Sequence, residues 1–281
     1  MSNREAFSRE GYLKERYHYF HLRDTAGQER DFHFHDFDKL IILISGSVEY
    51  AVEGSIYSPG SWDVLLVKHH TIHKAMIDKS APYERIIIYL DRGYFDRAMP
   101  DADLFGCFDR AAEMGQYVFK TGSAERNVLR RLLEDYERCA VSDEYGMEAM
   151  KDTYIMQLLI NVGRIAAGNA AAVGEKQYDL KLSGVLTYIN EHLTEELTVE
   201  LLAEKAYLSR YHFMRLFKAQ TGSTVHAYVR QKRLMYASRL IREGTPAVRA
   251  AAESGFGDYS AFHRAFTETF GISPGKMKEN G

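Results

Sequence analysis

The chain has 281 residues and a mass of 32.2 kDa, a length that suits one large or two ordinary domains. Hydrophobic residues make up 46% of the chain and charged residues 27%, which is ordinary globular usage and excludes a wholly disordered protein. The 36 Lys and Arg residues against 39 Asp and Glu residues give a formal charge of −3, which argues against a strongly basic nucleic-acid coat protein.

Cysteine usage and the N-terminal sequence indicate the compartment. Cys107 and Cys139 form no CxxC motif and no Cys/His cluster of finger spacing, so we expect neither a disulfide framework nor a structural zinc site. The first residues are charged and lack a signal-peptide core, and no apolar run approaches the roughly 18 residues of a membrane span. We expect a cytoplasmic protein without a membrane partner.

Residues from about 15 to 90 have the pattern of short strands separated by turns. The runs rich in Ile, Val, Leu and Tyr are Lys39–Ser45, Val48–Val52, Val64–Lys68 and Arg85–Leu90. Short strands at this spacing predict an antiparallel sandwich or barrel. We take residues 1–100 as this β domain.

After Tyr94 the hydrophobic period becomes helical. Apolar residues recur at helical spacing between Val128 and Tyr136 and between Ile155 and Ile165. These stripes either cover the barrel or pack against a second subunit, and isologous dimers are the commonest oligomers. We expect a homodimer with residues 101–168 as its helical dimerisation region.

A linker over residues 169–181 separates two parts of opposite charge. Its small residues and Gly174 show no periodicity. Residues 182–281 have a helical pattern throughout, and residues 181–281 carry 14 Lys/Arg and 10 Asp/Glu, a formal charge of +4. The preceding residues carry −7. This asymmetry is typical of a nucleic-acid reader joined to a separate control domain.

A weak repeat about fifty residues apart lies in the C-terminal part, over 198–219 and 246–270. Each copy is a short amphipathic helix, a tight turn and a second helix. Ser209 and Asp258 stand where an N-cap opens the second helix. Thr198 and Thr245 are expected to cap the first helices, with Pro246 at the first helical position. The repeat predicts two helix-turn-helix motifs.

Each second helix has an aromatic face and a polar face. Phe213 and Phe217 match Phe262 and Phe266, so one side docks on the partner helix and the other is free to enter the DNA major groove. A plain helical bundle with solvated charges is the alternative, and the matched caps and aromatics disfavour it. The expected DNA-binding residues are Arg210, Tyr211, Met214, Arg215, Lys218, Tyr259, Ser260, His263 and Arg264.

Residues 182–281 resemble the DNA-binding domain of AraC/XylS-type transcription regulators. The resemblance rests on the first motif "LTVELLAEKAYLSRYHFMRLFKAQTG", on a connecting helix with Arg233 and Leu234, and on the terminal "GFGDYSAFHRAFTETFGISPGK". Val225 departs from the family, which usually has Pro there. The resemblance implies operator DNA and RNA polymerase as partners, base contacts from Tyr211, Met214 and Arg215 and their counterparts in the second helix, and phosphate contacts from Arg210 and Lys218.

The β region resembles a cupin. His33, His35, Lys39 and Gly46 follow the spacing of the first cupin motif, and His73 supplies the His of the second. Lys39 stands where cupins have a metal-binding Glu, so we expect no bound metal or other cofactor; His33, His35 and His73 remain weak metal candidates. The pocket residues expected to bind an effector are His33, His35, Lys39, Tyr50, Trp62 and His73. The alternative is that these side chains only hydrogen-bond to one another inside the barrel core and bind no effector.

Together these patterns predict an α+β protein, an N-terminal antiparallel cupin-like barrel with appended helices followed by an all-α domain with two helix-turn-helix motifs. The expected function is sequence-specific transcription regulation in response to a small molecule, with a sugar or sugar derivative favoured by the resemblance to sugar-responsive family members. Two alternatives stay open. One is a metal-dependent cupin enzyme fused to a DNA-binding domain, against our expectation of no enzymatic activity. The other is a constitutive DNA-binding protein whose barrel serves only for dimerisation.

Overall fold

The chain folds into two compact units. The computed structural model describes residues 13, 15–24, 33–53, 55–78, 82–168, 180–221 and 223–279. The barrel unit comprises the described residues up to 24 and those of 37–168, and the helical unit comprises those of 180–279 together with 33–36. Most of the predicted linker, residues 169–179, lies outside the described residues.

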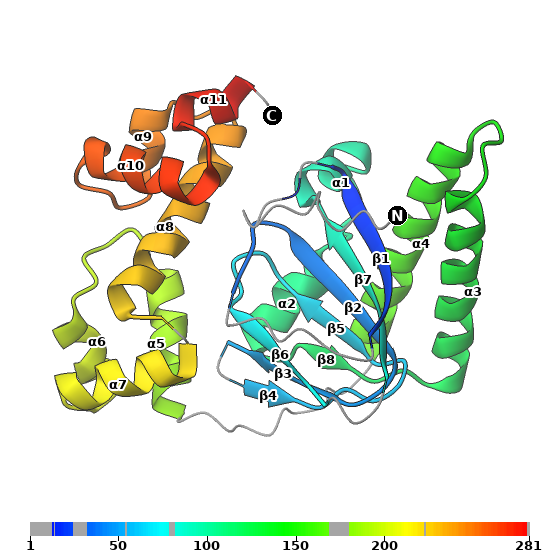
Figure 1. Cartoon of the computed structure of the whole chain (residues 1–281), viewed down its shortest axis with the longest axis horizontal. Helices are drawn as coiled ribbons and strands as arrows, with labels where there is room; N and C mark the ends of the chain where they lie inside the picture. Colours follow the sequence, from blue (N-terminus) through cyan, green and yellow to red (C-terminus); the bar gives the residue numbers. More distant parts are fainter. Residues whose placement is uncertain are drawn as a thin grey trace. The chain divides into compact units, whose positions relative to one another are not determined.

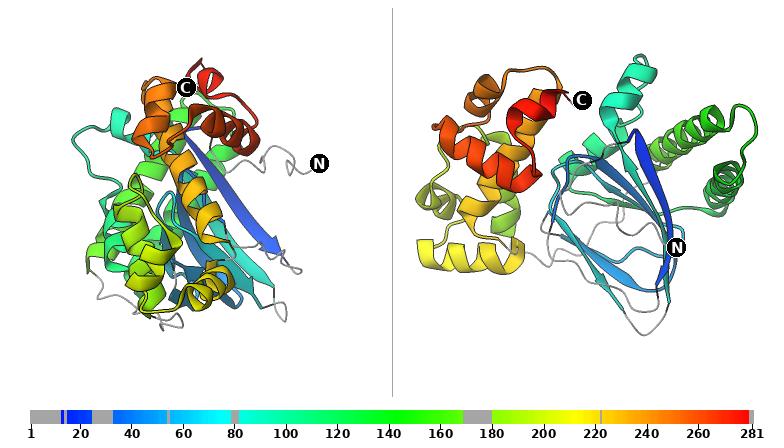
Figure 2. Two further views of the ribbon diagram at one scale, coloured as in Figure 1. Left: turned by 90° about the vertical axis from the view of Figure 1, so that its left-hand side faces the viewer. Right: turned by 45° about the horizontal axis from the view of Figure 1, so that its top comes forward.

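The barrel unit contains two antiparallel sheets in the described part of the chain (Figures 1 and 2). The strands of the larger sheet, in spatial order, are β1 (Tyr17–Asp24), β7 (Tyr83–Leu90), β2 (Asp38–Ser45), β5 (Val64–Val67) and β8 (Val118–Phe119). Those of the smaller sheet are β4 (Ser55–Tyr57), β3 (Val48–Val52) and β6 (His73–Ile77). The predicted antiparallel β domain is confirmed.

Strand β2 shows why this sequence forms a two-layer core. Its residues Leu40–Leu43 are all 2% exposed or less, so both faces of the strand are covered and the run is continuously apolar instead of alternating. The turn after β2 requires Gly46, whose φ is +97°. A Cβ there would lie 2.7 Å from the carbonyl oxygen of Pro82, which no side chain tolerates.

Within the described residues of the barrel unit, the helices are α1 (Arg92–Ala98), α2 (Gly106–Met114), α3 (Ser123–Ala140) and α4 (Met147–Gly168). Helices α3 and α4 pack side by side (Figure 1). Their apolar stripes, such as Leu129 and Leu159, join the same core cluster as the strands. The stripes therefore cover the barrel within one chain, which is the first of the two readings of their pattern.

The helical unit consists, in the part of the chain that the structure describes, of α5 (Leu180–Glu191), α6 (Val199–Lys205), α7 (Arg210–Thr221), α8 (Val225–Arg242), α9 (Ala247–Glu253), α10 (Tyr259–Phe270) and α11 (Pro274–Glu279). Helices α6 and α7 form the first helix-turn-helix motif and α9 and α10 the second, with α8 between them (Figure 1). None of the described helices combines the length and hydrophobicity needed to span a bilayer.

Side-chain caps define the helix starts in this unit. The hydroxyl of Thr198 accepts a hydrogen bond from the Leu201 N–H at 3.1 Å, and the Asp258 carboxylate accepts one from the Ala261 N–H at 2.6 Å. The predicted cap by Thr245 is wrong, because α9 begins at Ala247 after Pro246 and no side chain caps it. Proline fixes φ there without a hydroxyl, so the helix starts one residue later.

Two further caps account for the starts of α7 and α8. The Ser209 hydroxyl accepts from the His212 N–H at 3.4 Å, as predicted. The Thr224 hydroxyl accepts from the Ala227 N–H at 3.3 Å. Since Thr224 starts α8 in this way, the helix does not need the proline that the family usually places at Val225.

Candidate functional site

The first recognition helix, α7, separates its buried and exposed faces sharply. Phe213 and Phe217 have no exposed surface, whereas Tyr211 is 75% exposed and Met214 is 38% exposed. Arg215 and Lys218 are also exposed. Large hydrophobic side chains left in water on one helix face indicate a surface that binds a partner.

Arg210 begins the same helix and already has a partner. Its guanidinium lies 3.0 Å from the carboxylate of Glu200 on α6, and both side chains are more than half exposed. An exposed ion pair of this kind contributes little to stability.

The second recognition helix, α10, repeats this arrangement. Phe262 and Phe266 are fully buried, while Ser260 and Arg264 are exposed and His263 is half-buried. Tyr259 is 38% exposed. The two helices therefore present all nine sequence-predicted residues on the described surface, except that His263 is partly covered.

The turns of the two motifs have the same backbone geometry but different residues. Tyr207 and Gly255 both have positive φ, +54° and +83°. At Gly255 a Cβ would lie 2.9 Å from the Thr194 carbonyl oxygen and 3.0 Å from the Arg233 side chain. Arg233 of α8 in turn donates to the Leu193 carbonyl at 2.8 Å. The second turn is thus packed against the connecting helix, whereas Tyr207 is 86% exposed.

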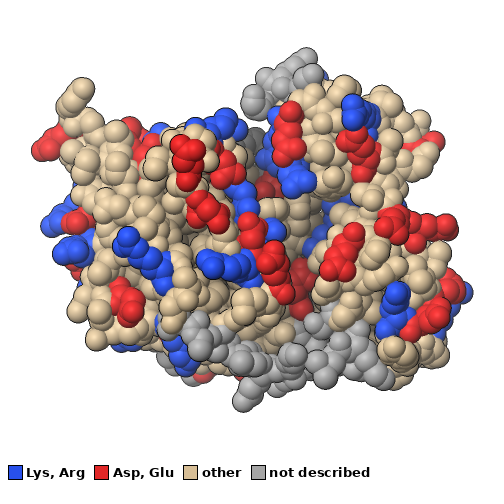
Figure 3. All heavy atoms as spheres, turned by 180° about the vertical axis from the view of Figure 1, so that it is seen from behind, with Lys and Arg blue, Asp and Glu red and all other residues tan. Residues whose placement is uncertain are grey.

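Charge is mixed over one face of the molecule. Figure 3 shows Lys and Arg side chains intermingled with Asp and Glu over the face drawn there. Such a distribution agrees with the modest charge of the C-terminal residues.

In the barrel unit, two polar pairs bridge the sheets. The Lys39 Nζ on β2 lies 3.5 Å from the His73 Nε2 on β6, and Lys39 also lies over the Tyr89 ring at 5.7 Å. The Tyr50 hydroxyl on β3 is hydrogen-bonded to the Tyr83 hydroxyl on β7 at 2.6 Å. Because each pair joins one sheet to the other, both lie in the interior.

Burial governs the chemistry of these interior groups. It raises the pKa of Tyr50 and of Tyr83, so both hydroxyls stay protonated. The His73 ring Nδ1 lies 2.9 Å from the Thr71 carbonyl oxygen, which requires the proton on Nδ1 and leaves Nε2 as the acceptor toward Lys39. The interior thus offers a lysine amino group, an imidazole and hydroxyls, with the Tyr89 ring beside the lysine.

Trp62, His33 and His35 are the other sequence-predicted pocket residues. Trp62 has φ +69° in the turn before β5, its ring lies 5.0 Å from the Arg130 guanidinium on α3, and its carbonyl accepts from the Thr121 hydroxyl. His33 and His35 belong to the helical unit, with ring centroids 6.2 Å apart. Among the described residues, no three His, Cys, Asp or Glu side chains are grouped to hold a metal ion.

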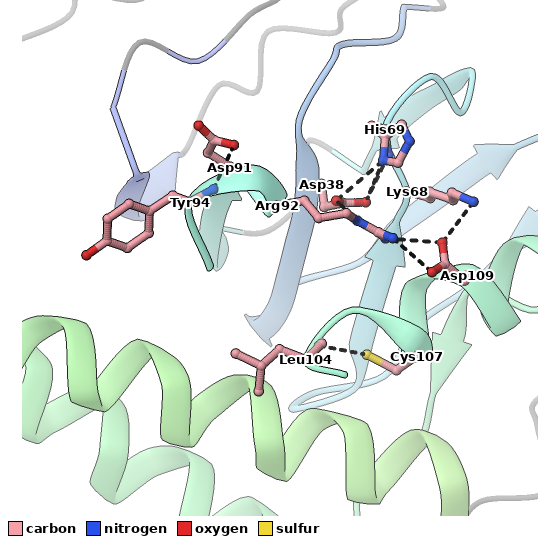
Figure 4. Close-up of polar contacts among 9 residues, drawn as sticks. All are labelled: Asp38, Lys68, His69, Asp91, Arg92, Tyr94, Leu104, Cys107 and Asp109. Atoms are coloured by element: carbon pink, nitrogen blue, oxygen red, sulfur yellow. Dashed lines mark hydrogen bonds and ion pairs between the residues drawn. The ribbon is translucent and has the colours of Figure 1, made fainter. Parts of the chain in front are cut away.

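An ion-pair network that the sequence did not reveal lies on the other side of β2 (Figure 4). Asp38 is fully buried and accepts from the His69 backbone N–H at 3.0 Å and from the Arg92 Nε at 3.1 Å. Arg92 also donates two hydrogen bonds to Asp109 at 2.8 and 3.1 Å, and Lys68 lies 2.8 Å from the same carboxylate. The network ties α1 and α2 to β2 and to Lys68 and His69, which directly follow β5.

The pKa values show the strength of this network. Burial by itself raises the pKa of Asp38, but the hydrogen bond from His69 and the charge of Arg92 outweigh it and lower the pKa. The same competition at Asp109, with hydrogen bonds from Arg92 and Lys68, lowers its pKa to about 2. The residues of this network are far apart in the sequence and follow no helical or strand period. Their grouping therefore becomes visible only in the folded structure.

Comparison with known proteins identifies both units. A helix-turn-helix domain matches residues 202–280, and an AraC-like ligand binding domain matches residues 17–159, half of the chain. The chain belongs to the AraC family. This AraC-family protein is therefore a DNA-binding transcription regulator with a ligand-binding domain, as the resemblance implied.

Curated relatives cover most of the chain. The HTH-type transcriptional activator RhaS of Salmonella schwarzengrund is 25% identical over 253 residues, 88% of this chain and 87% of the relative. The probable transcriptional regulator LumQ of Photobacterium leiognathi is 24% identical over 257 residues, 89% of this chain and 93% of the relative.

Solved structures also resemble the chain. The DNA-binding domain of AdpA in complex with a target DNA is 33% identical, with a TM-score of 0.33, over 34% of this chain and 86% of that one. ToxT from Vibrio cholerae is 12% identical, with a TM-score of 0.36, over 95% of this chain and 99% of that one.

Proposed function

We propose that this AraC-family regulator responds to a small polar effector, a sugar or sugar derivative, bound in the interior of the barrel unit. The observation that carries the proposal is the buried Lys39–His73 pair between the two sheets, with Nζ 3.5 Å from Nε2. A lysine only 8% exposed is costly unless polar groups surround it.

The neighbouring side chains suit a carbohydrate. Tyr89 offers an aromatic face beside Lys39, and the Tyr50 and Tyr83 hydroxyls form a second polar pair at 2.6 Å. A sugar presents hydroxyls on its edges and an apolar C–H face, so it needs hydrogen-bonding groups together with an aromatic ring. The chain acts as a sensor and not as an enzyme, since the Lys39 cation replaces the carboxylate that a cupin metal centre uses.

The proposed DNA contacts follow the exposed faces of α7 and α10. Arg215 and Arg264 pair with guanines, because a guanidinium matches the two acceptors on the major-groove edge of guanine. Arg210 and Lys218, at the two ends of the exposed stripe of α7, hold phosphates and set the position of the helix. The remaining predicted residues contact neighbouring base edges.

We also propose that a homodimer forms through the outer face of α4. The helix keeps Ile160 40% exposed although its stripe is buried in the chain's own core, and a Cβ at Gly163 would meet open space. Ile160 and Gly163 line a surface hollow, and Asp103, Arg110 and Arg164 border it. A surface with both charge signs around an exposed isoleucine can pair with a second copy of itself, as an isologous contact requires.

Effector binding is tested with the full chain and a panel of hexoses, pentoses, deoxysugars and sugar acids. A sugar that binds should raise the midpoint of thermal unfolding of the protein. It should also change the affinity of the protein for a DNA duplex selected with the full chain from a randomised pool. The Lys39→Met variant should lose both responses, while Lys120→Met, a change at an exposed lysine, should keep them.

Two results would contradict the proposal. No response to any sugar, in either assay, would favour the barrel as a dimerisation module alone. Stoichiometric iron, manganese or zinc in protein purified without chelator, together with turnover of a substrate, would favour the metal-dependent enzyme.

A further inference from the structure

The exposed face of α7 contains a hollow. Its lining comes from α7, from the first residue of α6 and from the start of α8. The lining residues are Val199, Tyr211, Met214, Arg215, Lys218, Thr224, Val225 and His226. The stripe Tyr211, Met214, Arg215 and Lys218 follows helical spacing, so the hollow lies on the same face that is offered to DNA.

The floor and the rim of this hollow differ chemically. Val199 and Val225 are each 3% exposed and close the hollow from behind, while Met214 is 38% exposed and stands at its opening. Arg215 and Lys218 are the charged groups of the lining, and both only donate hydrogen bonds. No Asp, Glu, Asn or Gln is among the described lining residues.

This chemistry discriminates among base edges in the major groove. Cytosine and adenine present amino groups, which are read by carboxylate or carboxamide side chains. Guanine presents the acceptors O6 and N7, and thymine presents the acceptor O4 beside its 5-methyl group. The charged groups Arg215 and Lys218 match the acceptors of guanine and thymine, and the apolar lining residues Val199, Met214 and Val225 match the methyl group of thymine.

We propose that α7 reads a guanine through Arg215 and, on a neighbouring base pair, a thymine whose 5-methyl group enters the hollow against Met214 and Val225. The inference rests on the proposed reading of DNA by α7 and adds a thymine, with Met214 as its contact, to the guanine proposed for Arg215. Met214 is then a specificity-determining residue, because an unbranched thioether adapts its shape to the methyl group.

The second recognition helix lacks this arrangement. Aligning the two motifs by their buried phenylalanines places His263 at the position of Met214 and Thr267 at that of Lys218. Imidazole and hydroxyl groups are polar where α7 is apolar and cationic. The two halves of the DNA site therefore differ in sequence, and the thymine methyl matters in the α7 half.

The test replaces thymine by deoxyuridine, which removes only the methyl group. A preferred duplex is selected with the full chain from a randomised pool, and the α7 half is identified as the part where Arg215→Ala relaxes the selected sequence. Each thymine is then replaced in turn, and affinity is measured by fluorescence anisotropy at fixed salt. Burial of one methyl group predicts an approximately fourfold loss at one thymine of the α7 half.

Two variants decide the role of Met214. Met214→Ala should bind the thymine duplex more weakly and lose most of the difference between thymine and deoxyuridine at that position. His263→Ala, the matched control in α10, should retain the fourfold difference. The inference is overturned if no deoxyuridine substitution in the α7 half weakens binding, or if Met214→Ala keeps the full difference. A pool without any enriched sequence would instead overturn the proposed DNA reading itself.

Discussion

The buried ion-pair network at Asp38 makes a quantitative prediction for Asp38→Asn. The asparagine keeps the shape of the side chain and an oxygen that accepts from the His69 N–H, which lies 3.0 Å away. It loses the charge that faces Arg92 Nε at 3.1 Å and the His69 ring at 3.2 Å. Hydrogen bonds to charged groups contribute about 1.5–3 kcal/mol each.

The loss of folding stability is reduced because Arg92 keeps its two hydrogen bonds to Asp109, at 2.8 and 3.1 Å. We expect Asp38→Asn to lower the free energy of unfolding of the barrel unit by about 3 kcal/mol, at the lower limit for breaking a buried pair. Urea denaturation followed by the fluorescence of Trp62 measures this, since it is the one tryptophan in the sequence and lies in the barrel unit. The control Asp101→Asn, at an exposed carboxylate, should change stability by less than about 0.5 kcal/mol.

The difference between wild type and Asp38→Asn should also depend on pH. The pKa of Asp38 is lowered from its usual 3.8 in the folded chain, so its stabilisation is present above the unfolded pKa and is lost as pH falls through the lower, folded pKa. The difference should be constant near neutral pH and shrink below about pH 4. Equal stabilities for Asp38→Asn and Asp101→Asn near pH 7 would refute the reasoning.

Three further outcomes are expected. Arg215→Ala should lose about 1–3 kcal/mol of discrimination at one base pair in gel-shift titrations, whereas uniform weakening across sequences would make Arg215 a phosphate contact. Tyr207→Gly should stabilise the helical unit by about 0.5–1 kcal/mol in denaturation followed by circular dichroism, since glycine adopts the left-handed backbone without strain. Gly255→Ala, at a turn packed against Thr194, should destabilise the unit by more than about 1 kcal/mol. A less stable Tyr207→Gly variant together with a more stable Gly255→Ala variant would contradict this. Ile160→Asp should shift sedimentation from dimer toward monomer, and an unchanged mass would exclude this face of α4 as the interface.

Local patterns in the sequence were sufficient for the architecture and for the exposed face of each predicted DNA-binding helix. The predicted runs Lys39–Ser45 and Val48–Val52 match β2 and β3 almost residue for residue. A short apolar run between two turns has few stable conformations other than a buried strand. The caps at Thr198 and Asp258 were visible because capping depends on neighbours three residues away. The exposed face of α7 followed from the helical period alone.

The tertiary structure decided the features that depend on residues far apart in the chain. The sequence did not show whether the stripes of α3 and α4 cover the barrel or a partner, since an apolar face carries no record of what it packs against. Nor did it show that Asp38, Arg92 and Asp109 form one network, or that His33 and His35 belong to a different unit from Lys39. Periodicity reports the geometry of one helix or strand, whereas a charge pair or an interior pocket is assembled only when separate elements pack together.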